Sequence, residues 1–216
     1  PRKQQAALAA DYGSYPGKEY DFIGADNALL APLATAGRTV TTYYPYDGDN
    51  LPAVRTYYLL PMIRTNGIGL FHYFGHSGDY SLGVSERLLR VPGGNGDDVG
   101  VGSWNPFLAV VVGCRVSRWQ ALTANVFFLP YGLFAPTNAG FAAGLGATGY
   151  LADDTGNWIG KSLYEAATNG TLRLGDFYTA GMQRLAADYP GIPVSQLQCF
   201  GLLGDPAIVF RHDLSA

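Results

Sequence analysis

The chain has 216 residues, of which 48% are hydrophobic and 14% are charged. This composition is typical of a globular protein with a packed core, and it excludes a disordered tail or a coiled coil. The formal net charge is −3 and the 14 Lys and Arg residues are scattered, so we expect no nucleic-acid partner, which would need a basic patch. No apolar run reaches the roughly 20 residues that a membrane-spanning helix requires, and no membrane-spanning segment is expected.

The first residue is Pro1 and not Met. We therefore expect the chain to be part of a longer or processed polypeptide, and we leave its location open between the cytoplasm and export. Two cysteines, Cys114 and Cys199, lie in different predicted elements, so they give no indication of a disulfide framework.

The first half of the chain alternates strand and helix patterns. An apolar run over residues 5–10 predicts a strand, and leucines on one face of residues 26–36, followed by Gly37, predict a helix with a C-terminal glycine. Thr, Val and Tyr dominate residues 38–46, which favours a second strand. Residues 50–62 predict a second helix that Pro61, near its end, bends or terminates.

The second half continues the alternation. Residues 67–75 and 107–112 are apolar without clean alternation, as expected for strands that are covered on both faces. The remaining predictions are a strand over 140–151, helices over 159–169 and 174–189, and a last strand over 202–210 that a turn at Gly204-Asp205-Pro206 enters. Strands that alternate with helices predict one α/β domain over residues 1–216, with a mainly parallel sheet and right-handed crossovers.

Two reactive side chains come at the ends of predicted strands. His76 follows the strand over 67–75, and Cys114 follows the strand over 107–112. In open parallel sheets, reactive groups gather beyond the carboxyl ends of the strands, and a Cys/His pair is the minimum for catalysis by a thiolate nucleophile. Taken singly, a cysteine after a buried strand is more often a small core residue, so the hypothesis depends on their joint placement.

Four segments carry a family resemblance. Phe71-His-Tyr-Phe-Gly-His-Ser-Gly78 and Val110-Val-Val-Gly-Cys114 resemble the histidine and cysteine blocks of the caspase-like cysteine peptidases, a group that includes caspases, metacaspases, clostripain and gingipains. Gly146-Ala-Thr-Gly-Tyr-Leu-Ala-Asp-Asp154 is similar to the later strand and specificity loop of that group. Leu202-Leu-Gly-Asp-Pro-Ala-Ile-Val209 is similar to the closing segment of bacterial gingipain-type domains, the nearest members.

The resemblance implies a three-layer sandwich in which helices flank a central, mainly parallel sheet of about six strands. It also implies a cysteine endopeptidase: Cys114 attacks the scissile carbonyl to form an acyl-enzyme, and His76 protonates the leaving amine. Backbone N–H groups of Cys114 and of Ser77 or Gly78 would form the oxyanion hole. The sequence departs from the pattern at Ser77, where the group has Gly after the histidine, and at Gly113 before the cysteine.

The resemblance places the substrate-binding pocket among the loops that carry Asp11, Asp153 and Asp154. If one of these carboxylates is buried and not paired with Arg115 or Arg118, we expect a basic P1 side chain in the peptide or protein substrate. The alternative is that Asp153 and Asp154 cap the helix that follows them.

We assign no metal and no cofactor. Asn95-Gly96-Asp97-Asp98 has the composition of a cation-binding loop but not the spacing of a calcium loop with its terminal Glu. Because some of the peptidases that the chain resembles depend on calcium, calcium binding by this cluster stays an alternative.

Two alternatives remain. The chain could be a catalytically inactive caspase-like module with an interaction or regulatory role, which the departure at Ser77 would suit. It could also be a serine hydrolase in which Ser77 is the nucleophile and His212 the base, although Asp79 stands where the nucleophile turn of such enzymes needs a small residue.

Overall fold

The computed structural model describes residues 4–11, 20–44, 53, 55–83, 88–91, 98–99, 106–118, 128–134, 140–167 and 172–210. A six-stranded sheet forms its centre, with the strand order β2-β1-β3-β6-β7-β9. Its strands are β1 (Gln5–Ala10), β2 (Thr39–Tyr43), β3 (Leu70–Phe74), β6 (Phe107–Val112), β7 (Phe141–Ala147) and β9 (Phe200–Leu203). All neighbouring pairs are parallel except β7 and β9, which are antiparallel. The predicted mainly parallel sheet of about six strands is confirmed.

The sheet separates two hydrophobic cores. Alternate side chains of β1 point to opposite sides, so Ala6 and Leu8 belong to one core while Ala7 and Ala9 belong to the other. Every residue of β3 and β6 is buried. Strands that are covered on both faces need no polar alternation, which explains the apolar sequence of β6 and, apart from His72, of β3.

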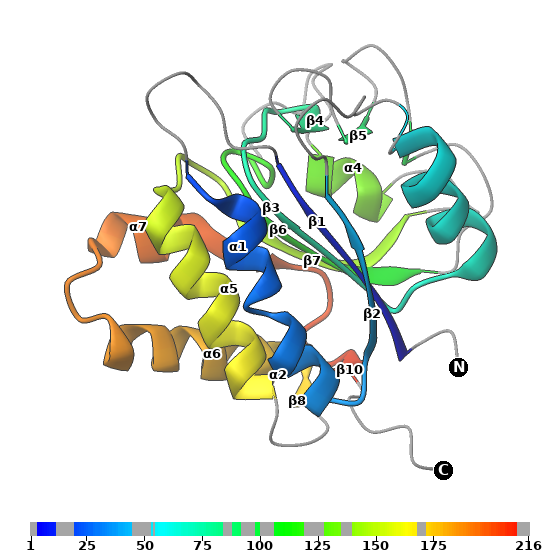
Figure 1. The fold of residues 1–216 in the computed structure, drawn as a ribbon. Coiled ribbons are helices and arrows are strands. Elements are labelled where there is room, and N and C mark those ends of the chain that lie inside the picture. The colour runs from blue at the N-terminus through cyan, green and yellow to red at the C-terminus, as the bar shows by residue number, and fades with distance from the viewer. Residues whose placement is uncertain are drawn as a thin grey trace.

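Helices cover both faces of the sheet (Figure 1). One face carries α1 (Phe22–Asn27), α2 (Leu30–Thr35), α5 (Asp153–Ala167), α6 (Leu174–Asp188) and α7 (Val194–Cys199). The other carries two π-helical segments, η2 (Arg55–Leu59) and η3 (Met62–Asn66), together with α4 (Phe128–Phe134) and the hairpin of β4 (Ser81–Leu82) and β5 (Leu89–Arg90). A small separate sheet pairs β8 (Leu172–Arg173) with β10 (Val209–Phe210). The expected three layers are therefore present.

The first predicted helix differs from the observed one at its start. It begins at Phe22 because Asp21 caps it, the carboxylate accepting a hydrogen bond of 2.7 Å from the N–H of Gly24. A turn at residues 28–29 divides it into α1 and α2. Its end agrees with the prediction, since Gly37 has a φ of 73°, which glycine adopts without strain.

The sequence predicted that Pro61 bends or ends the second helix, and the helix does not end there. Pro61 is the N-cap of η3, and the helical segment continues to Asn66. The proposed cap at Asn50 lies outside the described residues.

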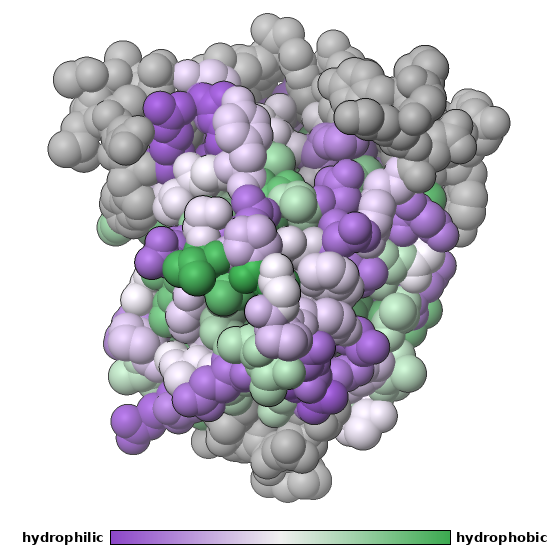
Figure 2. Space-filling model, turned by 90° about the vertical axis from the view of Figure 1, so that its left-hand side faces the viewer, coloured by the Kyte–Doolittle hydropathy of each residue, from purple (hydrophilic) through white to green (hydrophobic). Residues whose placement is uncertain are grey.

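Three further differences concern the second half. Helix α5 begins at Asp153, six residues before the predicted start at 159, and the predicted last strand is two strands, β9 and β10, separated by a turn around Gly204, whose φ is 117°. Helices α4 and α7 and the β4–β5 hairpin were not predicted. The face of the molecule that Figure 2 shows is mixed, with a hydrophobic patch among hydrophilic and intermediate residues. No described helix has the length and apolarity to cross a membrane.

Candidate active site

His76 and Cys114 lie at the same edge of the sheet. Phe74 on β3 pairs with Val112 on β6, and each reactive residue comes two positions after its paired strand residue. The ladder continues for one step, since the N–H of Gly75 donates to the carbonyl of Val112 at 3.1 Å. The parallel register therefore delivers the imidazole and the thiol to neighbouring loops, as the sequence predicted.

The thiol of Cys114 is half-buried against the loop that follows β7. Its Sγ accepts a hydrogen bond of 3.4 Å from the backbone N–H of Leu151. Burial raises the pKa of the thiol, and the negative charge of Asp153 raises it further, while the Leu151 N–H and the Arg115 guanidinium lower it. Because burial is the largest of these effects, the group keeps its proton to higher pH than an exposed cysteine does.

The backbone after Cys114 has an unusual conformation. Arg115 has a φ of 59°, the one positive φ of a non-glycine residue in the described part of the chain. The peptide between Cys114 and Arg115 is held at both ends: its carbonyl accepts from Ser77 Oγ at 2.8 Å, and its N–H donates to the carbonyl of Gly149 at 2.8 Å. Three loops thus meet at the residue that follows the thiol.

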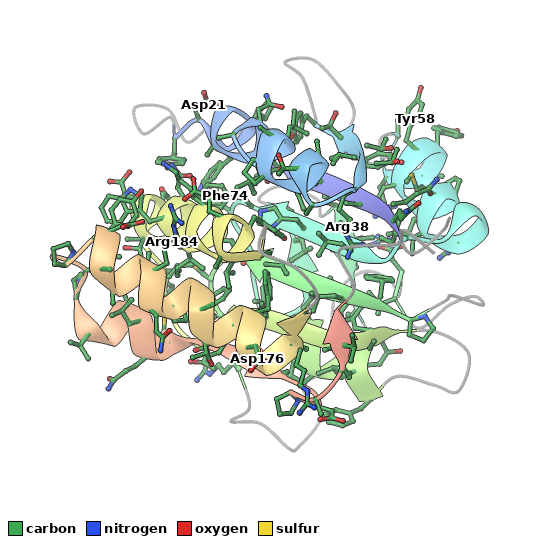
Figure 3. All side chains as sticks on the ribbon, turned by 90° about the horizontal axis from the view of Figure 1, so that it is seen from below. Asp21, Arg38, Tyr58, Phe74, Asp176 and Arg184 are labelled. Atoms are coloured by element: carbon green, nitrogen blue, oxygen red, sulfur yellow. The ribbon has the colours of Figure 1, made fainter. Side chains whose placement is uncertain are left out.

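The imidazole of His76 lies against an aromatic cluster. Its ring makes an edge contact with Phe22, with 5.1 Å between centroids, and Phe22 in turn contacts Phe74, which Figure 3 labels. The carbonyl of His76 accepts hydrogen bonds from the hydroxyl of Tyr73 and from the N–H of Gly83. Backbone and ring are therefore both fixed by buried neighbours.

The three backbone N–H groups predicted for the oxyanion hole differ in availability. The N–H of Gly78 donates to the carbonyl of Ser81 at 3.0 Å. For the N–H groups of Ser77 and Cys114, the described residues supply no acceptor. The latter two can therefore turn toward a ligand, whereas that of Gly78 is engaged in the loop.

The three acidic residues predicted for substrate binding have different environments. Asp11 is buried at the end of β1, and its N–H donates to the carbonyl of Phe74. Asp153 and Asp154 are exposed residues in the first turn of α5, a position that also favours helix formation. The carboxyl of Asp153 is partly covered, which raises its pKa, while the nearby His76 lowers it.

Arg115 pairs with a different carboxylate. Its guanidinium donates to Asp79 Oδ2 at 2.9 Å and lies 5.8 Å from the centre of the Tyr150 ring. The ion pair joins the loop after His76 to the loop after Cys114, and it leaves the carboxylates of Asp153 and Asp154 without a charge contact from Arg115.

Helix α7 supports the loop that touches the thiol. The Gln196 side chain accepts from the N–H of Ala152 at 2.8 Å and donates to the carbonyl of Tyr150 at 3.1 Å. These two bonds lie on either side of Leu151, whose N–H contacts Cys114 Sγ. The carbonyl of Tyr150 also lies 3.8 Å from Cys199 Sγ, and both cysteines are free thiols.

A buried polar cluster on β3 was not recognised in the sequence. His72 is 1% exposed, its Nε2 lies 3.0 Å from Asp26 Oδ1, and its Nδ1 lies 3.0 Å from the hydroxyl of Tyr164. Burial raises the pKa of Asp26, and His72 opposes this effect. The histidine interrupting the apolar sequence Leu70-Phe-His-Tyr-Phe74 was the available signal, because a histidine buried there needs partners from other elements.

Other parts of the described chain do not add to this site. Within the described residues, no three His, Cys, Asp or Glu side chains are grouped to hold a metal ion. Of the Asn95–Asp98 cluster only Asp98 is described, and its carboxylate pairs with Arg90 and Arg55.

A cavity of about 540 Å³ lies at the opposite end of the sheet, between the amino ends of β3, β6 and β7. Arg38, which Figure 3 labels, is one of the residues that line it.

The sequence matches the model of peptidase family C25 over residues 2–211. The chain therefore belongs to this family. A search of curated protein sequences gives no match.

Solved structures agree with this assignment at the level of the fold. The Arg-specific cysteine proteinase gingipain R (RgpB) is 17% identical with a TM-score of 0.73 over 96% of this chain and 47% of its own. The complex of the Porphyromonas gingivalis RgpB pro- and mature domains gives 15% identity and a TM-score of 0.71, covering 95% and 48%. The Drosophila initiator caspase Dronc gives 11% identity and 0.51, covering 98% and 82%. The chain has a caspase-like cysteine peptidase fold and spans about half the length of the gingipain chains that it matches.

Proposed function

We propose that the chain is a cysteine endopeptidase in which Cys114 is the nucleophile and His76 the general acid and base. The observation that carries the proposal is the register of β3 and β6, which places both residues two positions beyond the pair Phe74 and Val112. Membership of a peptidase family supports a protein or peptide substrate.

Acylation can be followed atom by atom. The raised pKa of the Cys114 thiol means that it holds its proton at neutral pH, so a base must take this proton as Sγ bonds to the scissile carbonyl carbon. His76 takes it and passes it to the leaving amine as the peptide C–N bond breaks. Water then hydrolyses the acyl-enzyme and regenerates the thiol.

The carbonyl oxygen becomes negatively charged during the attack. Fixed N–H donors stabilise such a charge at little cost in reorganisation. The N–H groups of Ser77 and Cys114 fit this role because neither has an acceptor among the described residues. Gly78 is the weaker of the predicted donors, since its N–H is bonded to Ser81.

A basic P1 residue is the proposed preference. Asp153 lies close enough to Cys114 to raise the pKa of the thiol, and His76 lowers the pKa of Asp153. Arg115 is bonded to Asp79 instead. Asp11 and Asp154 complete the proposed acidic surroundings. Gingipain R, whose fold this chain shares, is an Arg-specific cysteine proteinase, and its specificity supports the same preference.

The serine-hydrolase alternative has less support. Ser77 Oγ donates its proton to the Cys114 carbonyl at 2.8 Å, whereas a serine nucleophile must donate to a base. The proposed base, His212, lies outside the described residues.

The test uses acyloxymethyl-ketone probes with Arg, Lys, Leu or Asp at P1. We expect the Arg and Lys probes to label the wild type and Cys199→Ala, and to leave Cys114→Ala and His76→Ala unlabelled. Labelling only by the Leu or Asp probe would overturn the basic preference and keep the peptidase. Failure of every probe, together with no cleavage of a denatured protein substrate, would favour the inactive interaction module.

A further inference from the structure

Ser77 and Gly113, the two positions at which the sequence departs from the family pattern, lie against each other. A Cβ atom added to Gly113 would lie 2.3 Å from Ser77 Oγ and 3.1 Å from Ser77 Cβ. The side chain at position 77 thus fills the space that a side chain at position 113 would need. The two departures form one structural feature.

The Ser77 hydroxyl also makes a directed contact. It donates to the carbonyl of Cys114 at 2.8 Å, and the N–H of the same peptide donates to Gly149 at 2.8 Å. One bond comes from the loop after β3 and the other from the loop after β7. The peptide that follows Cys114 is therefore held between two loops, with little freedom to rotate.

The backbone conformation that this restraint imposes on Arg115 is energetically unfavourable, and the two hydrogen bonds offset this. Arg115 has a φ of 59°, which is unfavourable for a residue with a Cβ. Strained backbone of this kind persists where the surroundings hold it, and it is common at functional sites. If the Ser77 bond is lost, the Cys114–Arg115 peptide can rotate toward a relaxed conformation.

Rotation there would affect both groups that Cys114 contributes to the site. Its N–H has no acceptor among the described residues, and its Sγ is held at 3.4 Å from the Leu151 N–H. We propose that Ser77 is a positioning residue whose hydroxyl, by fixing the peptide after Cys114, holds the thiol and its N–H in the orientation for attack. The inference rests on the proposed function and adds a side-chain role for Ser77 to it.

The experiment uses a Cys199→Ala background, in which Cys114 is the sole thiol. In this background we would compare Ser77→Ala, Ser77→Gly, Gly113→Ala and Ser77→Gly/Gly113→Ala. Ser81→Ala is the matched control, because it removes a hydroxyl from β4, the strand that follows the Ser77 loop, and the described structure shows no partner for that hydroxyl. Three experiments are made on each variant: thermal denaturation for the melting temperature, hydrolysis of a peptide with Arg at P1 for kcat and KM, and alkylation by iodoacetamide from pH 6 to 10.

We expect Ser77→Ala to lower kcat about tenfold, the effect of one hydrogen bond on the transition state, with little change in KM or melting temperature. The pH midpoint of alkylation should move upward, because a displaced Sγ loses the Leu151 N–H. Gly113→Ala should lower the melting temperature, and Ser77→Gly/Gly113→Ala should recover part of it, since the carbonyl of Gly75 still lies 2.9 Å from the added Cβ. The double variant should not recover kcat, because it lacks the hydroxyl.

Two results would overturn the proposal. One is a Ser77→Ala variant with the kcat and alkylation profile of Ser81→Ala; the other is a double variant that regains kcat together with stability, which would show that Ser77 only fills space. If even the wild type cleaves no peptide, the proposed function fails by itself. Alkylation needs no substrate, so its pH midpoint in Ser77→Ala then decides the positioning role alone.

Discussion

The two histidines of β3 and its following loop, His72 and His76, are four residues apart and have opposite environments. His72 is 1% exposed, with Asp26 on one ring nitrogen and Tyr164 on the other. His76 is half-buried beyond the end of the strand, beside the loop of Cys114. A histidine with a carboxylate partner looks like a catalytic arrangement, but the one here lies in a core that substrate cannot reach. The proposal that His76 acts in catalysis therefore depends on its position at the carboxyl end of the sheet and not on the presence of an Asp partner.

The largest expected effect separates the two histidines by activity. His76→Ala should lower kcat/KM about 1,000-fold, the size of a lost general acid and base. Its melting temperature should change by no more than about 2 °C, because a half-buried side chain contributes little to the core. Peptide hydrolysis and thermal denaturation check both values. An active variant would show that His76 is not the general acid.

The second prediction concerns the stability of the buried cluster. Asp26→Ala should lower the free energy of unfolding by about 3 kcal/mol, because it leaves His72 without its carboxylate in the core. Urea denaturation measures this loss. Asp21→Ala on the same helix is the control, and the loss of that N-cap should cost about 1 kcal/mol. Equal losses in the two variants would mean that the buried pair contributes little.

The third prediction compares the two buried tyrosines, Tyr73 and Tyr164, that contact these two histidines. The Tyr73 hydroxyl bonds to the His76 carbonyl and the Gly83 N–H, whereas the Tyr164 hydroxyl bonds to His72. Both Tyr73→Phe and Tyr164→Phe should lower stability by about 1–2 kcal/mol. Tyr73→Phe alone should also lower kcat, about threefold, because it loosens the loop of His76. A similar kcat in the two variants would contradict a role of Tyr73 at the site.

The smallest expected effect is on the pH dependence of the thiol. Asp153 raises the pKa of Cys114, so Asp153→Asn should lower this pKa and increase the thiolate fraction at neutral pH. In the Cys199→Ala background, alkylation near pH 7.5 should become about twofold faster, as expected for one partly screened charge. Its pH midpoint should move down. Asp154→Asn is the control for the loss of a neighbouring charge, and an equal shift in both variants would rule out a specific effect of Asp153.

Much of the fold was predictable from single residues and short patterns. The strands β1 and β6 have the predicted bounds because apolar runs that polar or glycine residues terminate are unambiguous. His76 and Cys114 were predicted as site residues because each follows such a run. Helices α4 and α7 have seven and six residues, too few to show a helical period, and tertiary contacts stabilise them.

The parts of the site that depend on distant pairs were not predictable. Nothing in the sequence of β3 indicates that Asp26 packs onto His72, because the contact depends on how α1 lies on the sheet. The contact between Ser77 and Gly113 is similar, because each residue alone looked like an isolated departure from the family pattern. Only the structure shows that Ser77 Oγ lies 2.3 Å from the position that a Cβ at residue 113 would take. Patterns along the chain specify elements and their ends, whereas such pairs depend on the packing between elements.

The pairing of β3 with β6 has a consequence for how this protein can change. The hydrogen-bonded pairing of β3 with β6 runs from the pair Leu70 and Leu108 to the pair Phe74 and Val112, and it fixes the distance between the loops that carry His76 and Cys114. The length of the segment that joins the two strands therefore does not determine this distance. The length of that connection beyond Gly83 can therefore change over evolution without moving the thiol relative to the imidazole, as long as β3 and β6 keep this register. Variation can accumulate there while the chemistry stays in place.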